Sequence, residues 1–376
     1  MVNSSPKVGL VHDWLNQMGG AEKVLLELAA MYPEAPLHTS ILAPELVDPG
    51  FGQLDVRTNF MQRLPGVVQR HRWYLPVYPL AFGATSLDDY DVVISNASAF
   101  CKSVRTPART LHVCYCLTPT RFVWSPAGYL AREDVGAALR IGMRPLLALL
   151  RWWDRRSARR VDRFVAISNA VAERIRDYYG RESAVIYPPV ATGVFKPVPE
   201  PEDYFLVVSR LAPYKRIDLA VRACTELGLP LKVIGSGRDR AALERLAGPT
   251  VEFLGRQDDE VVRRHFARCR AFIFPGEEDF GITPVEAQAA GRPVVAFAAG
   301  GALDTVLPGE TGEFFHEPTV DLLARVLQSF DETRYSATRM VANAQRFDEA
   351  VFVQEMKSFV TGAWAEHTNG ERADGR

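Results

Sequence analysis

The chain of 376 residues is 47% hydrophobic and 24% charged, and its formal net charge is −1. This length exceeds one ordinary hydrophobic core, so we expect two domains of fewer than about 200 residues each. The near-zero charge gives no general reason to expect binding to nucleic acid, and no apolar run reaches the roughly 18 residues of a membrane span. The five cysteines are scattered and the N-terminus has no signal-peptide pattern. We therefore expect a cytoplasmic protein with reduced thiols.

The first predicted element is a buried strand over residues 7–12, which ends at His12. Gly19 and Gly20 follow in a loop, and the apolar spacing then predicts a helix over 21–31. A strand, a glycine pair and a helix can bind phosphate, because backbone N–H groups at a helix start attract anions. The full glycine fingerprint is absent, so a simple turn explains the pair equally well. His12 lies at the sheet edge where ligands bind and is a candidate contact.

Three further strands are predicted over residues 37–42, 91–95 and 111–116. The last one leads into a segment that carries Leu117 and Arg121. Because the carboxyl ends of parallel strands meet at one edge, we expect this segment to lie near the same ligand edge as His12.

Residues 139–164 hold eight arginines and two acids, interleaved with leucines and two tryptophans. This composition predicts a long helix and leaves two interpretations open. The helix can pack on the domain with a solvated basic face. Alternatively, it can dock on an anionic membrane surface, near which each arginine contributes roughly 1 kcal/mol.

A segment rich in Pro and Glu, from Pro188 to Asp203, has no periodicity and is typical of a domain linker. A strand over 204–209 follows and presents Arg210 at its carboxyl end, and Lys215 lies at the predicted start of the next helix. These cations suit a diphosphate, because a guanidinium can bind two oxygens at once and an ammonium acts as a point charge. A solvated basic turn is the alternative.

Two more strands are predicted over residues 231–234 and 251–254. Gly235 makes a sharp turn after the first, and Arg256 follows the second. Both residues are therefore expected at the same edge as Arg210.

The most informative stretch is residues 276–286, which follows an apolar strand over 271–274. Glu278 stands on the loop, and Gly281 allows the backbone to pass close to a ligand. Thr283 is the predicted N-cap of the next helix, with Glu286 three residues later in a capping box. A capping role alone would explain Glu286 equally well.

Glu278 and Glu286, with seven residues between them, resemble the Glu-x7-Glu signature of retaining glycosyltransferases of the GT-B fold, family 4, often called group 1. Other segments of the chain resemble further motifs of that family and occur in the expected order. They are Gly19-Gly20-Ala21-Glu22, Arg210 with Lys215, residues 233–237 and residues 253–255. The resemblance runs from about residue 8 to about residue 315 and covers most of the chain.

The resemblance implies an α/β protein of two Rossmann-like domains that face each other across a cleft. The expected first domain is residues 1–192, on the acceptor side, completed by a C-terminal helix over 348–367 that crosses back to it. The expected second domain, residues 203–346, binds the nucleotide-sugar donor. Residues 368–376 are polar, and we expect a disordered tail.

The resemblance also assigns roles to residues. Arg210 and Lys215 would stabilise the departing diphosphate, Glu278 would contact the transferred sugar, and Glu286 would accept hydrogen bonds from ribose. The expected catalytic residues are Glu278, Arg210 and Lys215. The expected donor contacts are Gly19, Gly20, Arg210, Lys215, Gly235, Arg256, Glu278, Phe280, Gly281, Ile282, Thr283 and Glu286. His12 and Arg121 are candidate contacts of the sugar or acceptor. No metal and no cofactor besides the nucleotide sugar are expected, because cationic side chains can replace Mg²⁺.

The glycine loop and the segments around Arg121 and Trp152 resemble a mannosyltransferase-like branch, which favours GDP-mannose as donor. The acceptor would be a glycan or lipid-linked sugar of cell-envelope polysaccharide or glycolipid synthesis, and a lipid-linked acceptor agrees with a basic helix on the inner membrane face. A UDP-sugar donor is one alternative. Leu117 replaces a His that relatives commonly carry, so a non-catalytic nucleotide-sugar-binding relative is another. An epimerase of the same fold should lack the Arg210, Lys215, Glu278 and Glu286 set.

Overall fold

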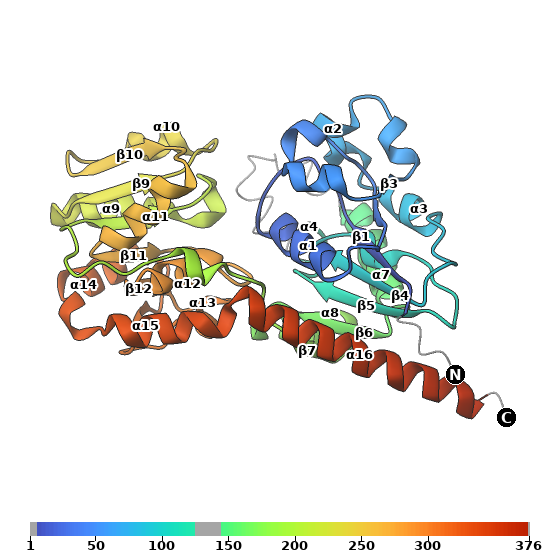
Figure 1. Ribbon diagram of the computed structural model, residues 1–376. Helices are drawn as coiled ribbons and strands as arrows, with labels where there is room; N and C mark the ends of the chain where they lie inside the picture. The colour runs from blue at the N-terminus through green and yellow to red at the C-terminus, as the bar shows by residue number, and fades with distance from the viewer. Residues whose placement is uncertain (1–5, 125–143, 375–376) are drawn as a thin grey trace. The chain divides into compact units, whose positions relative to one another are not determined.

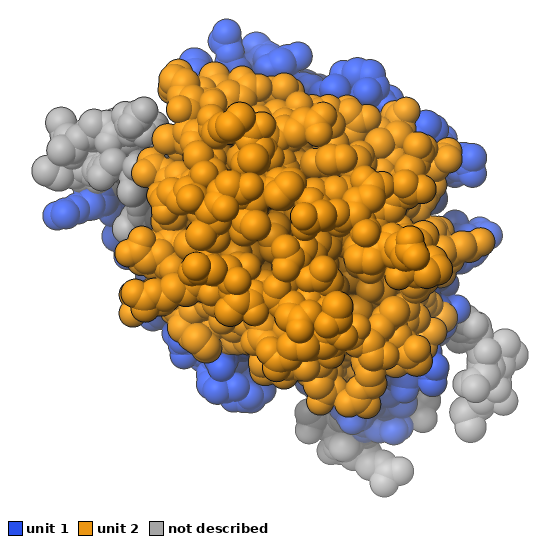
Figure 2. All heavy atoms as spheres, turned by 90° about the vertical axis from the view of Figure 1, so that its left-hand side faces the viewer, with its two compact units in different colours: residues 1–189, 352–376 blue, residues 190–351 orange. Residues whose placement is uncertain are grey.

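The structure is a computed structural model that describes residues 6–124 and 144–374. The chain divides into two compact units, which Figure 2 shows in different colours. Unit 1 comprises residues 1–189 and 352–376, and unit 2 comprises residues 190–351. The boundary falls inside the segment that the sequence predicts as a linker. Most of that segment belongs to unit 2, where Phe195 packs edge-on against Phe266 at 5.9 Å.

The sheet of unit 1 has seven parallel strands in the order β3-β2-β1-β4-β5-β6-β7. The strands are β1 (Val8–His12), β2 (Leu37–Thr39), β3 (Val56–Thr58), β4 (Val92–Ala97), β5 (Leu111–Cys116), β6 (Arg163–Ala166) and β7 (Ser183–Val185). Every residue of the central strands β1, β4 and β5 is buried, as expected for a parallel sheet covered on both faces. The strand order reverses between β1 and β4, and ligands of open α/β sheets bind at such a switch point.

The α-helices of unit 1 pack around this sheet (Figure 1). They are α1 (Gly20–Met31), α2 (Val67–Arg70), α3 (Tyr78–Gly83), α4 (Arg121–Trp124), α7 (Arg144–Ala158), α8 (Asn169–Tyr179) and α16 (Glu349–Asp374). Helix α1 buries Val24, Leu25 and Leu28, which recur at helical spacing on one face.

The last helix, α16, packs on unit 1, with Phe352 edge-on to Tyr115 of β5 at 5.6 Å. Glu366 pairs with Arg163 at 3.2 Å. Figure 1 shows α16 in red alongside β6 and β7. The sequence-based end at residue 367 is too early, since the helix continues to Asp374. The polar residues beyond 367 include no proline, so their composition alone does not end a helix.

The helix predicted over 139–164 ends earlier than predicted, at Ala158. Helix α7 runs from Arg144 to Ala158, and residues 139–143 lie outside the described part of the chain. The chain then turns, because Arg163 begins β6 and pairs with β5. No helix within residues 6–124 and 144–374 is long and apolar enough to cross a bilayer.

A buried polar network ties four segments of unit 1 together. Lys102 Nζ lies 2.6 Å from Asp154 Oδ1 of α7, and the side chains are 1% and 0% exposed. The other Asp154 oxygen accepts hydrogen bonds from Trp124 Nε1 at 2.7 Å and Tyr179 OH at 2.8 Å. Burial by itself lowers the pKa of Lys102, but the Asp154 carboxylate outweighs this and the pKa is raised. The network therefore holds a charged, fully paired cation in the interior.

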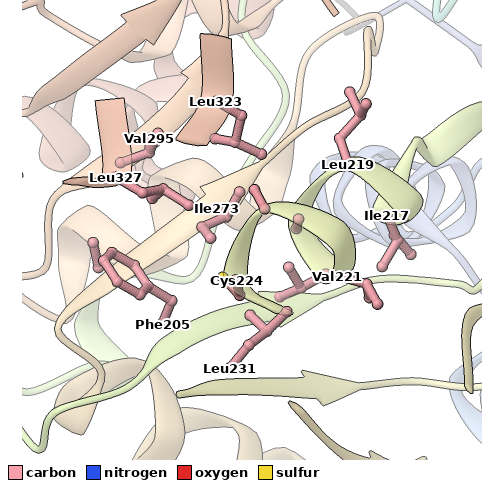
Figure 3. Packing of buried hydrophobic residues seen from close by; sticks show 14 of the residues in the cluster. Phe205, Ile217, Leu219, Val221, Cys224, Leu231, Ile273, Val295, Leu323 and Leu327 are labelled. Carbon is pink, nitrogen blue, oxygen red and sulfur yellow. The ribbon is translucent and has the colours of Figure 1, made fainter. Parts of the chain in front are cut away.

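Unit 2 contains six parallel strands in the order β10-β9-β8-β11-β12-β13. The strands are β8 (Phe205–Val208), β9 (Leu231–Ile234), β10 (Val251–Gly255), β11 (Ala271–Phe274), β12 (Val294–Phe297) and β13 (Gly312–Phe315). The α-helices are α9 (Ile217–Leu227), α10 (Arg240–Glu244), α11 (Asp259–Arg268), α12 (Ile282–Ala289), α13 (Ala302–Thr305), α14 (Val320–Gln328) and α15 (Ala337–Ala344). Figure 3 shows apolar side chains of α9 and α14 packed against those of the sheet, including Leu219, Ile273 and Leu323. The strand order reverses between β8 and β11.

Candidate functional site

Two loops flank the switch point of unit 2 at the carboxyl ends of its strands. One loop follows β8 and carries Arg210 and Lys215, and the other follows β11 and carries Glu278. The connections that follow β8 and β11 run to opposite sides of the sheet, and ligands of open α/β sheets bind beside the loops at such a point. The sequence predicts all three residues at this edge, and the strand order puts the loops that carry them next to each other at the switch point.

The two loops are joined by an ion pair. Lys215 Nζ contacts Glu278 Oε1, and the side chains are 16% and 23% exposed. A half-buried pair at a sheet edge is screened less by salt than a surface pair. The cationic loop and the acidic loop therefore share one face of unit 2.

Arg210 and Lys215 are joined through a residue that sequence reasoning overlooked, Tyr214. Arg210 Nη2 donates a hydrogen bond of 2.8 Å to the Tyr214 hydroxyl. The Lys215 ammonium lies 5.3 Å from the centre of the Tyr214 ring, and the guanidinium carbon lies 6.0 Å from it. These three side chains form a cluster that we call the cation fork. The signal in the sequence was the position of a tyrosine directly before Lys215.

Glycines fix the acidic loop between its neighbours. A Cβ on Gly276 would lie 2.7 Å from the carbonyl oxygen of Lys215. On the other side, a Cβ on Gly300 would lie 2.1 Å from the Glu278 carbonyl oxygen, and one on Gly301 would lie 2.2 Å from Phe280 Cα. At each of these three glycines a Cβ would overlap backbone atoms of a neighbouring segment, so only glycine fits there. The contacts hold the loop of Glu278 in place next to the cation fork.

The helix after this loop begins earlier than predicted. Helix α12 starts at Ile282 with Gly281 as its N-cap, and no side chain caps it. The prediction of Thr283 as the N-cap is wrong, because Gly281 adopts φ of +90° and turns the chain two residues sooner. Pro284 still fits in the first turn, where its missing N–H has no helical partner. Glu286 then lies in the second turn and is not part of a capping box.

The remaining predicted donor contacts of unit 2 lie at the same edge. Gly235 follows β9, and a Cβ there would meet the Ser209 carbonyl oxygen at 1.9 Å. Gly235 therefore brings the β9 loop against the backbone next to Arg210. Arg256 is exposed directly after β10, and Phe280 is buried against Phe347 at 5.5 Å. Contact of these residues with a ligand stays a prediction.

His12 of unit 1 is buried at the end of β1, with 1% of its surface exposed. Its Nδ1 lies 2.9 Å from the Asn96 carbonyl oxygen, and its Nε2 lies 3.8 Å from Glu22 Oε1. Burial by itself lowers the pKa of His12, but the Glu22 carboxylate and the other acceptors outweigh burial and raise it. Asn96 Nδ2 also donates to the Ala21 carbonyl at 2.8 Å. His12 thus helps to fix the start of α1, and its predicted contact with a sugar stays untested.

The switch point of unit 1 is filled by a buried carboxylate. Asp13 accepts hydrogen bonds of 2.7 to 2.8 Å from the backbone N–H groups of Ser98, Ala99, Phe100 and Cys101. Converging N–H groups form an anion-binding nest, and here the protein supplies the anion itself. Sequence reasoning missed Asp13, because its partners lie 85 to 88 residues further along the chain.

The other candidates of unit 1 lie near this edge. Gly19 and Gly20 are exposed at the start of α1, and Arg121 begins α4 shortly after β5. Leu117, at the position where the resemblance implies a His, is buried. His112 does not replace that His, because it lies in the core with its Nε2 2.9 Å from Ser95 Oγ. Burial lowers the pKa of His112 to about 4 and keeps its ring neutral.

Two Rossmann-like parallel-sheet units, one of which carries the cation fork beside an acidic loop, are typical of the GT-B fold. Family models agree with this class. The model described as "Glycosyltransferase Family 4" matches residues 18–194, and that described as "Glycosyl transferases group 1" matches residues 194–347. Together they span residues 18–347, so the chain belongs to the group 1 glycosyltransferases of family 4.

Relatives with assigned activities match parts of the chain. A GDP-mannose-dependent alpha-mannosyltransferase of Mycolicibacterium smegmatis is 41% identical over 107 residues, which are 28% of either chain. A protein of the same description from Mycobacterium tuberculosis is 30% identical over 216 residues, covering 52% of this chain and 57% of the relative. These alignments therefore span well under the full length of those enzymes.

Solved structures match the whole fold. A crystal structure of Anabaena Alr3699/HepE in complex with UDP has a TM-score of 0.70 and covers 95% of this chain and 100% of its own. The identity is 20%, so this likeness concerns the fold. The prediction of a GT-B protein with two parallel-sheet domains is confirmed.

Proposed function

We propose that the protein is a retaining glycosyltransferase that moves mannose from GDP-mannose to a glycan or lipid-linked acceptor, in cell-envelope polysaccharide or glycolipid synthesis. The observation that carries the proposal is the contact between Lys215 and Glu278 across the switch point of unit 2, beside Arg210. A diphosphate needs cations, a sugar needs acceptors for its hydroxyls, and this edge offers both side by side.

In this proposal the cation fork receives the donor diphosphate. Lys215 exchanges its contact with Glu278 for a phosphate oxygen, and Arg210 binds further oxygens. The exchange releases the Glu278 carboxylate to accept hydrogen bonds from hydroxyls of the transferred sugar. The uncapped N–H groups of Ile282 and Thr283 at the start of α12 add partial positive charge. Charge that grows on the leaving diphosphate is thereby stabilised without a metal.

GDP is the favoured base because several relatives that the chain matches are described as GDP-mannose-dependent mannosyltransferases. The complex of Alr3699/HepE contains UDP, which supports a UDP-sugar as the second candidate. Glu286 of α12 is the proposed ribose contact in either case. A non-catalytic nucleotide-sugar-binding protein stays as a third candidate, because the side chain of Leu117 has no polar atom.

Thermal unfolding with nucleotides tests the donor site. We expect GDP to raise the melting temperature by several degrees and UDP to leave it unchanged, since a ligand stabilises by roughly 2.7 kcal/mol at 100 times its Kd. The measurement is a thermal-shift series with GDP, UDP and ADP at equal concentrations. A response to UDP alone would support the UDP-sugar candidate. No response to any nucleotide would contradict the proposed function.

We also propose that α7 docks the protein on the inner face of an anionic membrane. Its outer face exposes Leu149 (59%) and Trp152 (61%), and Arg156 and Arg159 are exposed nearby. The only acid of α7, Asp154, is buried and already neutralised by Lys102. Exposed apolar side chains flanked by unopposed arginines suit a surface of anionic headgroups over an apolar layer.

Co-sedimentation with vesicles tests this surface. The variant Arg156→Glu with Arg159→Glu should pellet at least about fivefold less with vesicles containing phosphatidylglycerol, since each arginine adds roughly 1 kcal/mol. Arg155 is a poorer choice, because its Nε donates to the Tyr178 carbonyl at 2.8 Å. The control Arg222→Glu with Arg245→Glu makes the same charge change on unit 2. Equal pelleting of wild type and the α7 variant would contradict docking of α7 on the membrane.

A further inference from the structure

Tyr214 lies between the two cations of the cation fork. Its hydroxyl accepts the 2.8 Å hydrogen bond from Arg210 Nη2, while its ring faces the ammonium of Lys215 at 5.3 Å. Free arginine and lysine side chains sample many rotamers, and fixing each one costs conformational entropy. A residue that holds both cations before a ligand arrives lowers this cost of binding.

The backbone around Tyr214 is itself held in an uncommon conformation. Pro213–Lys215 form a short 3-10 turn, and Arg216 after it has φ of +52°. Arg216 is the only non-glycine residue with positive φ within the described chain. Such a conformation persists where the surroundings enforce it, and here Arg216 is bound to Asp218 at 3.1 Å. The Lys215 carbonyl also lies against Gly276, so the turn that carries Tyr214 cannot shift freely.

We infer that Tyr214 is a positioning residue that holds Arg210 and Lys215 next to each other at the diphosphate site before the donor binds. The inference rests on the proposed function, because it concerns the same diphosphate site. Tyr214 acts through the two cations and takes no part in the chemistry. The ring contributes cation–π attraction to both, and the hydroxyl fixes the direction of the guanidinium.

Substitutions separate these two contributions. Tyr214→Phe keeps the ring and removes the hydroxyl, so it should raise the Kd for GDP roughly fivefold, as expected for one lost hydrogen bond of about 1 kcal/mol. Tyr214→Leu removes the ring as well and should raise it further. Tyr335→Phe is the matched control, because it removes a hydroxyl from a 2.7 Å contact with Glu313 of β13. This control should leave the Kd for GDP unchanged.

A double-mutant cycle measured by calorimetry with GDP and with inorganic pyrophosphate tests the inference. If Tyr214 acts through Arg210, Tyr214→Phe should have less than about a twofold effect on either ligand in the Arg210→Ala background. A fivefold effect in both backgrounds, or none in either, would overturn the positioning role while leaving the donor site intact. If wild-type protein binds neither GDP nor pyrophosphate, the proposed function fails and this inference with it. Melting curves of each variant establish that it is folded.

Discussion

Lys215→Ala is expected to lower the turnover of GDP-mannose by about 10²- to 10³-fold. Lys215 is a half-buried cation that the proposal places where negative charge grows on the leaving diphosphate, and removing one such group typically costs about 2.7–4 kcal/mol. Glu286→Ala should lower the same turnover roughly tenfold or more, because it removes the proposed contact with the ribose. The measurement is release of GDP from GDP-mannose. Lys232→Ala is the control, because this lysine lies on β9 with its ammonium 4.2 Å from the Tyr204 ring.

Glu278→Gln distinguishes the two roles proposed for the ion pair. The variant keeps the shape of the side chain and removes the charge that neutralises Lys215. GDP should therefore bind as tightly as in wild type or more tightly, while transfer falls with the loss of a sugar contact. Wild-type turnover in Lys215→Ala, or weaker GDP binding in Glu278→Gln, would remove these residues from the proposed site.

Asp154→Ala is expected to lower the free energy of unfolding of unit 1 by about 3–5 kcal/mol. The substitution leaves the ammonium of Lys102 buried without its anion, and it also removes the acceptor of Trp124 and Tyr179. Urea unfolding followed by tryptophan fluorescence measures the change. Asp203→Ala is the control, since Asp203 pairs with Arg270 at 3.5 Å with its side chain 79% exposed and should cost at most about 1 kcal/mol.

The pair variant sharpens the test of the buried network. Lys102→Met with Asp154→Leu removes both charges together and should be less destabilised than Asp154→Ala, because no lone charge remains in the interior. A loss below about 1 kcal/mol in Asp154→Ala would mean that the network contributes little to stability.

The fold and the approach of Lys215 to Glu278 could be anticipated from the sequence for a simple reason. Continuous apolar runs predict buried parallel strands, and residues directly after such strands meet at one edge of the sheet. Arg210, Lys215 and Glu278 each follow a strand closely. Their positions therefore depended on little beyond the strand assignments, although their contacts with a donor stay predictions.

The details that the sequence did not reveal depend on contacts between distant residues. The backbone N–H groups that bind the Asp13 carboxylate lie on a loop more than 80 residues further along the chain, and no pattern near Asp13 predicts this contact. Gly281 starts α12 early because its backbone takes a left-handed turn, which a capping-box pattern cannot indicate. Trp124 and Asp154 lie in the segments around Arg121 and Trp152 that resemble a mannosyltransferase-like branch, and the structure shows that they share a buried network.

The central claim is that the diphosphate of a nucleotide sugar binds between Arg210 and Lys215 on unit 2. A crystal structure of the protein with GDP tests it most directly. We expect the β-phosphate within hydrogen-bonding distance of both cations, with Lys215 separated from Glu278. A diphosphate bound on another surface, with Lys215 and Glu278 still paired, would contradict it.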